Sequence, residues 1–92
     1  MAYSKSVRES IMKVPKSPGN LLGRWAINKN FSVVRIAKAT GATRQTVYNW
    51  MLGGAVTQAY QERVMTVMEF LRTSNTAEEA WQRLCKYYNL TA

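Results

Sequence analysis

Three side chains whose hydrogen-bonding groups match the edges of DNA bases lie close together in this 92-residue chain: Arg44, Gln45 and Asn49. An arginine guanidinium can donate two parallel hydrogen bonds to guanine, and a glutamine or asparagine amide can pair with adenine. If this segment is helical, the three side chains lie within about 140° of one another, with Val47 and Trp50 on the opposite side. The polar side then stays accessible when the apolar side packs against the protein. The chemistry that it indicates is readout of bases in the major groove.

Capping residues place this segment on the second of two short helices. Ser32 is a candidate N-cap for the first helix, because its side chain can accept a hydrogen bond from a free amide of the first turn. Gly41 is expected to end that helix, since glycine adopts the positive φ of a tight turn at little cost. Thr43 is a candidate N-cap for the second helix, which the pair Gly53 and Gly54 would end.

The segment from 33 to 52 resembles the helix-turn-helix of the phage repressor and Cro family. The resemblance rests on four positions at spacings of four, six and three residues: Ala37, Gly41, Val47 and Trp50. Thr40 departs from the family, in which that position usually carries a larger apolar side chain. The match extends from Leu21 to about Leu71. It implies an all-α fold of the lambda repressor type, a compact bundle of short helices.

The resemblance also implies which side chains would contact DNA. In this family the first two residues of the second helix, and one residue a turn later, contact bases; these positions are Arg44, Gln45 and Asn49 here. Five further residues are expected at the phosphate backbone or at a thymine methyl group: Arg35, Lys38, Thr43, Thr46 and Tyr48. Basic residues near the N-terminus are additional candidates for groove or phosphate contacts: Lys5, Arg8, Lys13 and Lys16.

The charge of the chain is unevenly distributed. Thirteen Lys and Arg residues and five acidic residues give a net charge of +8, and residues 10–61 hold seven of the bases and none of the acids. Residues 62–92 are balanced, with four of each. Positive charge gathered in one half of a chain favours a polyanionic partner. Because the bases are spread over several short helices, nucleic acid is favoured over a membrane surface.

The residue types exclude several chemistries. Without His no His-based triad or general base can form, and a carboxylate pair or metal cluster would need acids in segments that contain none. The lone Cys85 cannot form an internal disulfide, and a zinc site would need more Cys or His ligands. We therefore expect a protein that is not an enzyme and that holds no metal and no cofactor.

The pattern of caps and apolar residues predicts about five helices in three parts. Residues 1–16 form either a basic arm or one short helix, for which Ser6 and Glu9 could be a capping box. Residues 17–72 form the helix-turn-helix DNA-binding domain. Residues 73–92 form a C-terminal amphipathic helix, which packs on the domain or forms a dimer contact.

Three further N-caps are expected outside the segment 33–52. Ser17 is followed by proline, which favours the first position of a helix. Thr57 could open the long helix that ends near residue 72. Thr76 and Glu79 form the best capping box in the chain.

A monomer of five helices would not obviously bury two apolar features of the sequence. Met65 and Phe70 flank the main apolar stripe of their helix, and the last helix has an apolar face that includes Trp81, Leu84 and Tyr88. Exposed apolar strips usually mark interfaces. We therefore expect a homodimer through the C-terminal half, with two recognition helices about 34 Å apart on a pseudo-palindromic site.

No apolar run approaches the roughly 18 residues of a membrane span, and the N-terminus lacks the apolar part of a signal peptide. We expect a bacterial cytoplasmic protein, encoded by the host or a phage, that does not enter a membrane. The favoured function is a sequence-specific, Cro-like repressor that acts by occupying a double-stranded DNA operator. The alternative is a phage-encoded protein-interaction module that inhibits a host protein. Non-specific packaging of nucleic acid is a weaker alternative.

Overall fold

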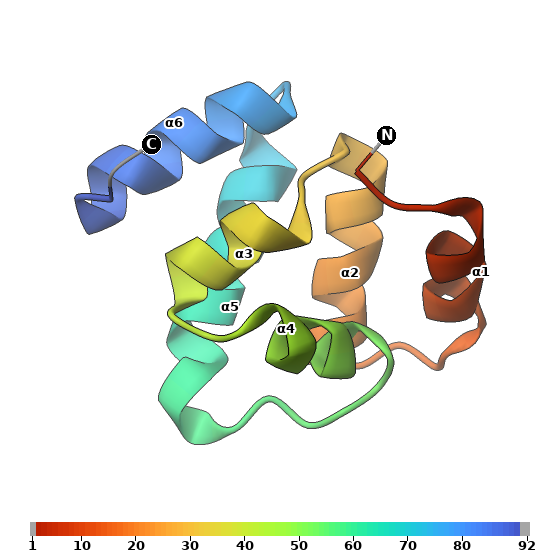
Figure 1. Cartoon of the computed structure of the whole chain (residues 1–92). Coiled ribbons are helices and arrows are strands. Elements are labelled where there is room, and N and C mark those ends of the chain that lie inside the picture. Colours follow the sequence, from red (N-terminus) through yellow and green to blue (C-terminus); the bar gives the residue numbers. More distant parts are fainter. Residues whose placement is uncertain (1, 91–92) are drawn as a thin grey trace.

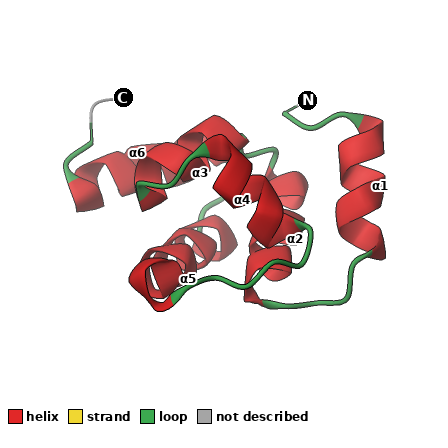
Figure 2. Cartoon of the chain, turned by 60° about the horizontal axis from the view of Figure 1, so that its bottom comes forward, coloured by secondary structure: helices red, strands yellow, loops and turns green. Residues whose placement is uncertain are grey.

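The structure, a computed structural model, describes residues 2–90, and this part of the chain is all-α (Figure 1). Its helices are α1 Lys5–Lys13, α2 Pro18–Lys29, α3 Val33–Thr40, α4 Arg44–Met51, α5 Gln58–Thr73 and α6 Ala77–Tyr88. Figures 1 and 2 both show α1 and α6 at opposite ends of the molecule, with α3 and α4 between them. The predicted all-α class is confirmed. The number of helices in the described residues is six instead of five, because the N-terminal segment is helical.

The N-caps expected at Ser17, Ser32, Thr43 and Thr76 are confirmed, since each side chain accepts a hydrogen bond from a first-turn amide. Thr57 occupies the N-cap position of α5 but forms no such bond. The capping box of α6 differs in one detail, because Glu79 accepts from the amide of Asn75 and not from that of Thr76.

The capping box expected at Ser6 and Glu9 is wrong. Ser4 is the N-cap of α1, and its Oγ accepts a hydrogen bond from the amide of Val7. The helix therefore begins two residues earlier than Ser6 would allow. Ser6 lies inside it, where its carbonyl accepts from the hydroxyl of Ser10.

The chain that precedes α1 is attached to the connection between α2 and α3. The Tyr3 hydroxyl donates to the carbonyl of Phe31 over 2.6 Å, and the amide of Ala2 donates to Asn30 Oδ1 over 2.6 Å. Tyr3 is only 4% exposed, and burial raises the pKa of its phenol well above the usual range. Of the two expectations for residues 1–16, an arm or a short helix, the described residues form the helix.

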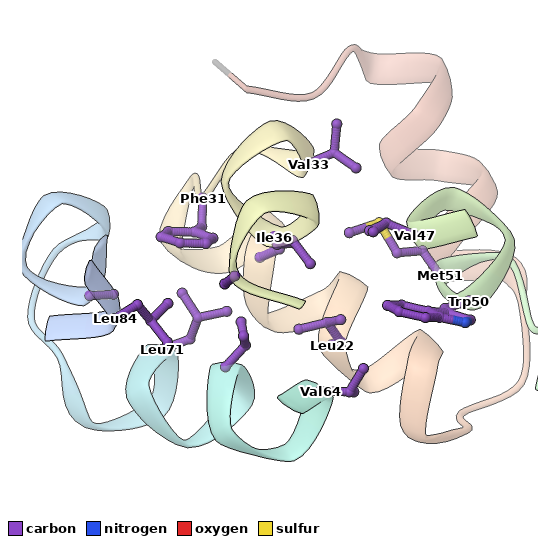
Figure 3. Close-up of a cluster of buried hydrophobic side chains, with 14 of the residues drawn as sticks. Leu22, Phe31, Val33, Ile36, Val47, Trp50, Met51, Val64, Leu71 and Leu84 are labelled. Atoms are coloured by element: carbon purple, nitrogen blue, oxygen red, sulfur yellow. The ribbon is translucent and has the colours of Figure 1, made fainter. Parts of the chain in front are cut away.

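One apolar core joins all six helices, and Figure 3 shows a large part of it. Each helix contributes at least one fully buried side chain: Ile11, Leu22, Ile36, Val47, Val64, Leu71 and Leu84. Trp50 is buried with them, as expected, and Trp25 packs at the edge. None of the described helices combines the length and apolar content that a membrane span needs.

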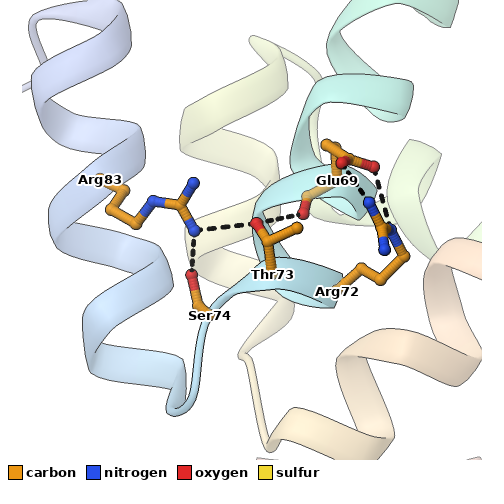
Figure 4. Close-up of polar contacts among 5 residues, drawn as sticks. All are labelled: Glu69, Arg72, Thr73, Ser74 and Arg83. Carbon is orange, nitrogen blue, oxygen red and sulfur yellow. Dashed lines mark hydrogen bonds and ion pairs between the residues drawn. The ribbon is translucent and has the colours of Figure 1, made fainter.

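Polar contacts fold α6 back along α5 (Figure 4). The Arg83 guanidinium donates to the hydroxyls of Thr73 and Ser74 over 2.9 and 2.7 Å, and it lies 4.7 Å from the centre of the Phe70 ring. The connection between the two helices is thus held by side chains from both of them.

Much of the apolar face of α6 is buried within the monomer, contrary to the expectation that a monomer would leave it exposed. Trp81 and Leu84 lie in the core, 3% and 0% exposed. Phe70 and Tyr88 are half-buried, and Met65 alone of the five expected dimer residues is clearly exposed. Trp81 and Leu84 are therefore core residues of the monomer.

Candidate nucleic-acid interface

The turn between α3 and α4 depends on the conformation of one glycine. Gly41 has φ of +79°, and its amide donates to the carbonyl of Ala37 over 2.8 Å. A Cβ at Gly41 would meet no atom within 4 Å. The position therefore requires glycine for its backbone angle and not for lack of space.

Thr40, the departure from the repressor family, is accommodated by hydrogen bonds within this turn. It is buried, and its hydroxyl donates to the carbonyl of Ile36 over 2.8 Å. The amide of Ala42 donates back to the same hydroxyl. A threonine can replace an apolar side chain here because its hydroxyl has one partner in α3 and one in the turn.

The inner side of α4 is packed tightly against α2. Val47, Trp50 and Met51 are buried, and α2 approaches so closely that a Cβ at Gly19 would lie 2.6 Å from the Trp50 carbonyl oxygen. This contact fixes which side of α4 faces solvent.

The outer side of α4 carries all three predicted base-reading residues. Arg44, Gln45 and Asn49 are exposed. Gln45 Nε2 donates to Asn49 Oδ1 over 3.1 Å, so the two amides lie side by side. The Arg44 side chain has no hydrogen bond or ion pair within the described residues. The outer face thus presents one free guanidinium and a pair of amides.

The starts of α3 and α4 lie at one shallow depression, which is lined by Val33, Thr43, Arg44, Gln45 and Tyr48. Thr43 accepts from the amide of Thr46 and donates to its hydroxyl. Tyr48 is half-buried and packs on the core. Free amides at helix N-termini attract anions, so a phosphate could bind beside the exposed face of α4.

The two basic residues predicted on α3 are in different situations. Lys38 is exposed, with no side-chain partner in the described residues. Arg35 is turned toward α6, where its Nη2 lies 3.0 Å from Glu78 Oε2 and its guanidinium lies 5.3 Å from the centre of the Trp81 ring. Hydrogen bonds from Gln82 and then from Arg35 lower the pKa of Glu78. The structure therefore places Lys38, but not Arg35, as a free cation on α3.

Three of the seven bases between residues 10 and 61 hold the fold together. Arg24 donates to the carbonyls of Met12 and Val14, Lys29 to that of Ser74, and Arg35 to Glu78. The other four have no side-chain partner in the described chain: Lys13, Lys16, Lys38 and Arg44. The number of basic side chains free to contact a ligand is thus smaller than the sequence count suggested.

Sequence reasoning missed one polar residue next to this site. Asn20 of α2 is 0% exposed, and its Nδ2 donates to the carbonyls of Ile11 and Met51 over 2.9 and 2.7 Å. The only signal in the sequence is a polar residue in the first turn of a helix, where asparagine is common, so its tertiary role could not be recognised.

The residues described hold no group of three or more His, Cys, Asp or Glu side chains that could bind a metal ion. Comparison of the chain with models of protein families, with curated proteins and with solved structures gave no match.

Proposed function

We propose that the chain is a sequence-specific DNA-binding protein and that α4 is its recognition helix. The observation that carries this proposal is that α4 has one buried and one exposed face. Val47, Trp50 and Met51 anchor the buried face in the core. The guanidinium of Arg44 and the amides of Gln45 and Asn49 lie on the exposed face. Paired donors and acceptors on an anchored, exposed helix suit the edges of bases in the major groove.

In the complex, phosphate contacts would come from groups beside α4. Lys38 and the free amides at the starts of α3 and α4 can neutralise or hydrogen-bond phosphates, and Thr43, Thr46 and Tyr48 can add contacts to the backbone or to a thymine methyl group. Phosphate contacts set the register of the protein on the duplex, and the base contacts of α4 supply the sequence preference.

The biological role that fits such a protein is a Cro-like repressor in the bacterial cytoplasm, which blocks transcription by occupying an operator. It would bind a pseudo-palindromic site as a homodimer, with half-sites about 34 Å apart. Among the predicted dimer residues, Met65 and the half-buried Phe70 and Tyr88 remain available for such a contact.

Selection of bound sites from random duplexes tests the proposal, with the wild-type chain and two triple variants. Arg44→Ala, Gln45→Ala and Asn49→Ala together should abolish enrichment of any sequence while the helical circular dichroism signal is retained. The control is Lys86→Ala, Gln58→Ala and Asn28→Ala, which removes one cation and two amides from exposed positions elsewhere.

Each rival function predicts a different result. Binding of all duplexes with similar affinity would indicate packaging of nucleic acid, and no binding to any duplex would favour the protein-interaction module. Retained sequence preference in the α4 triple variant would contradict the assignment of the recognition helix. A two-fold repeat in the selected sites would support the dimer.

A further inference from the structure

Asn20 connects the ends of two helices that are distant in sequence. Its Nδ2 reaches the carbonyl of Ile11, in the last turn of α1, and the carbonyl of Met51, the last residue of α4. The last carbonyls of a helix have no partner within the helix. The carbonyl of Ile11 also accepts from the amide of Val14, which follows the helix. A single buried amide thus bonds to a carbonyl in the last turn of each helix and joins the C-terminal ends of α1 and α4 to α2.

Arg24, one turn further along α2, completes this junction. Its Nε donates to Asn20 Oδ1 over 2.7 Å, and its Nη2 donates to the carbonyls of Met12 and Val14 over 3.2 and 3.0 Å. Every hydrogen-bonding group of the Asn20 amide except one lone pair is thus used. The orientation of the amide, and with it the end of α4, is fixed by the guanidinium.

The other end of α1 is attached near the start of α3. Tyr3, just before α1, donates to the carbonyl of Phe31, which precedes the N-cap of α3. The N-terminal segment therefore runs from the beginning of α3 to the end of α4, and it is hydrogen-bonded to the rest of the molecule at both places.

From this geometry we infer that Asn20 and Arg24 are positioning residues for DNA recognition: through α1 and α2 they fix the orientation of α4. The inference rests on the proposed function. Hydrogen bonds to bases need donor–acceptor distances of about 2.7–3.2 Å, so a small rotation of α4 would break them. Attraction to phosphates tolerates the same rotation, because it depends weakly on geometry. The two residues therefore affect base preference more than overall affinity for DNA.

The test compares Arg24→Gln with Lys29→Gln. Both substitutions remove one positive charge from α2. Arg24→Gln also removes two bonds to backbone carbonyls and one to Asn20, whereas Lys29→Gln removes one bond, to the carbonyl of Ser74, which has no connection to α4. Asn20→Ala is the stronger variant, and Arg24→Gln decides the question if that variant does not fold. The measurements are site-resolved amide hydrogen exchange and the affinity for a selected duplex relative to an unrelated duplex.

For Arg24→Gln we expect faster exchange in α1 and in the last turn of α4, with no change in α5 and α6. The affinity ratio of selected to unrelated duplex should fall about tenfold, comparable to the loss of one base contact. Lys29→Gln should leave the ratio unchanged. Equal effects of the two variants on α4 exchange and on the ratio would overturn the inference.

The exchange measurement separates this inference from the proposed function. If the wild-type chain binds no duplex, the proposed function fails, and with it the role in recognition. Faster amide exchange in the last turn of α4 in Arg24→Gln, and not in Lys29→Gln, would then still show that Asn20 and Arg24 position the helix. If the affinity ratio of selected to unrelated duplex is high in the wild type and identical in Arg24→Gln, only the positioning role fails.

Discussion

Arg35 of α3 and Glu78 of α6 form an ion pair, with Nη2 and Oε2 3.0 Å apart. The same guanidinium lies over the ring of Trp81, so α6 is attached to the first helix of the predicted helix-turn-helix by one charged and one aromatic side chain. This contact gives a structural role to a residue that the sequence assigned to phosphate binding. It also has measurable consequences for stability and for DNA affinity.

Removal of the Glu78 carboxylate should change the pH dependence of stability. Its pKa is lowered in the folded protein by hydrogen bonds from Gln82 and Arg35. A lowered folded pKa stabilises the protein above the unfolded pKa of about 4.3, and this contribution is lost as the pH falls through the folded pKa. Glu78→Gln should therefore lower the melting temperature at pH 7 and have little effect below the folded pKa.

Glu62→Gln is the control for this pH prediction. Glu62 is an exposed carboxylate of α5 whose side chain has no hydrogen bond or ion pair in the described residues. The measurement is the melting temperature of the wild type, Glu78→Gln and Glu62→Gln between pH 2 and pH 7. A difference between wild type and Glu78→Gln that stays constant over this range would argue against the ion pair in solution.

The two basic residues of α3 should differ in their effect on DNA binding. Each phosphate contact contributes about 0.9 to the slope of log affinity against log salt concentration. Because Lys38 is free and Arg35 is held by Glu78, Lys38→Gln should reduce the slope by about one and Arg35→Gln by much less. Equal changes in the slope would show that Arg35 leaves Glu78 when DNA binds.

The local features of this fold are readable in the sequence, and the tertiary partners are not. Ser17, Ser32 and Thr43 cap helices as predicted, because a cap depends on residues within one turn of it. The exposure of Arg44, Gln45 and Asn49 on one face of α4 likewise follows from helical periodicity. The attachment of Arg35 to Glu78 depends on where α6 packs, and no spacing within either helix encodes that.

The burial of Trp81 and Leu84 within the monomer was not predicted, for a related reason. The apolar face of that helix is visible in the sequence, but its partner could equally be the same chain or a second copy. In the structure α6 packs on α3 and α5, and Trp81 and Leu84 enter the core. Their burial depends on the direction in which α6 leaves the short connection after α5, and no spacing within the helix encodes that direction.

Substitutions on α6 should distinguish its buried side from its exposed side. Leu84 is fully buried, so Leu84→Ala should destabilise the monomer by about 2–5 kcal/mol. Tyr87 is 62% exposed, and Tyr87→Ala should have a much smaller effect. Urea denaturation at several protein concentrations measures both. A midpoint that rises with concentration in the wild type and not in Leu84→Ala would instead place Leu84 at a dimer interface.

Substitution of Gly19 and of Gly41 should destabilise the protein for different reasons, because Gly19 is limited by space and Gly41 by its backbone angle. At Gly19 a Cβ would lie 2.6 Å from the Trp50 carbonyl oxygen, so Gly19→Ala must separate α2 from α4 and should destabilise the protein by about 1–3 kcal/mol. Gly41 has open space and φ of +79°, so Gly41→Ala should cost about 1–2 kcal/mol through strain alone.

Asparagine at the same two positions separates these causes. It tolerates positive φ better than alanine does, so Gly41→Asn should be more stable than Gly41→Ala. At Gly19 the larger side chain increases the clash, and Gly19→Asn should be less stable than Gly19→Ala. Urea denaturation of the four variants tests the order. If asparagine were better than alanine at both positions, the close contact of α2 with α4 at Trp50 would be wrong, and the orientation of the recognition helix would have to be revised.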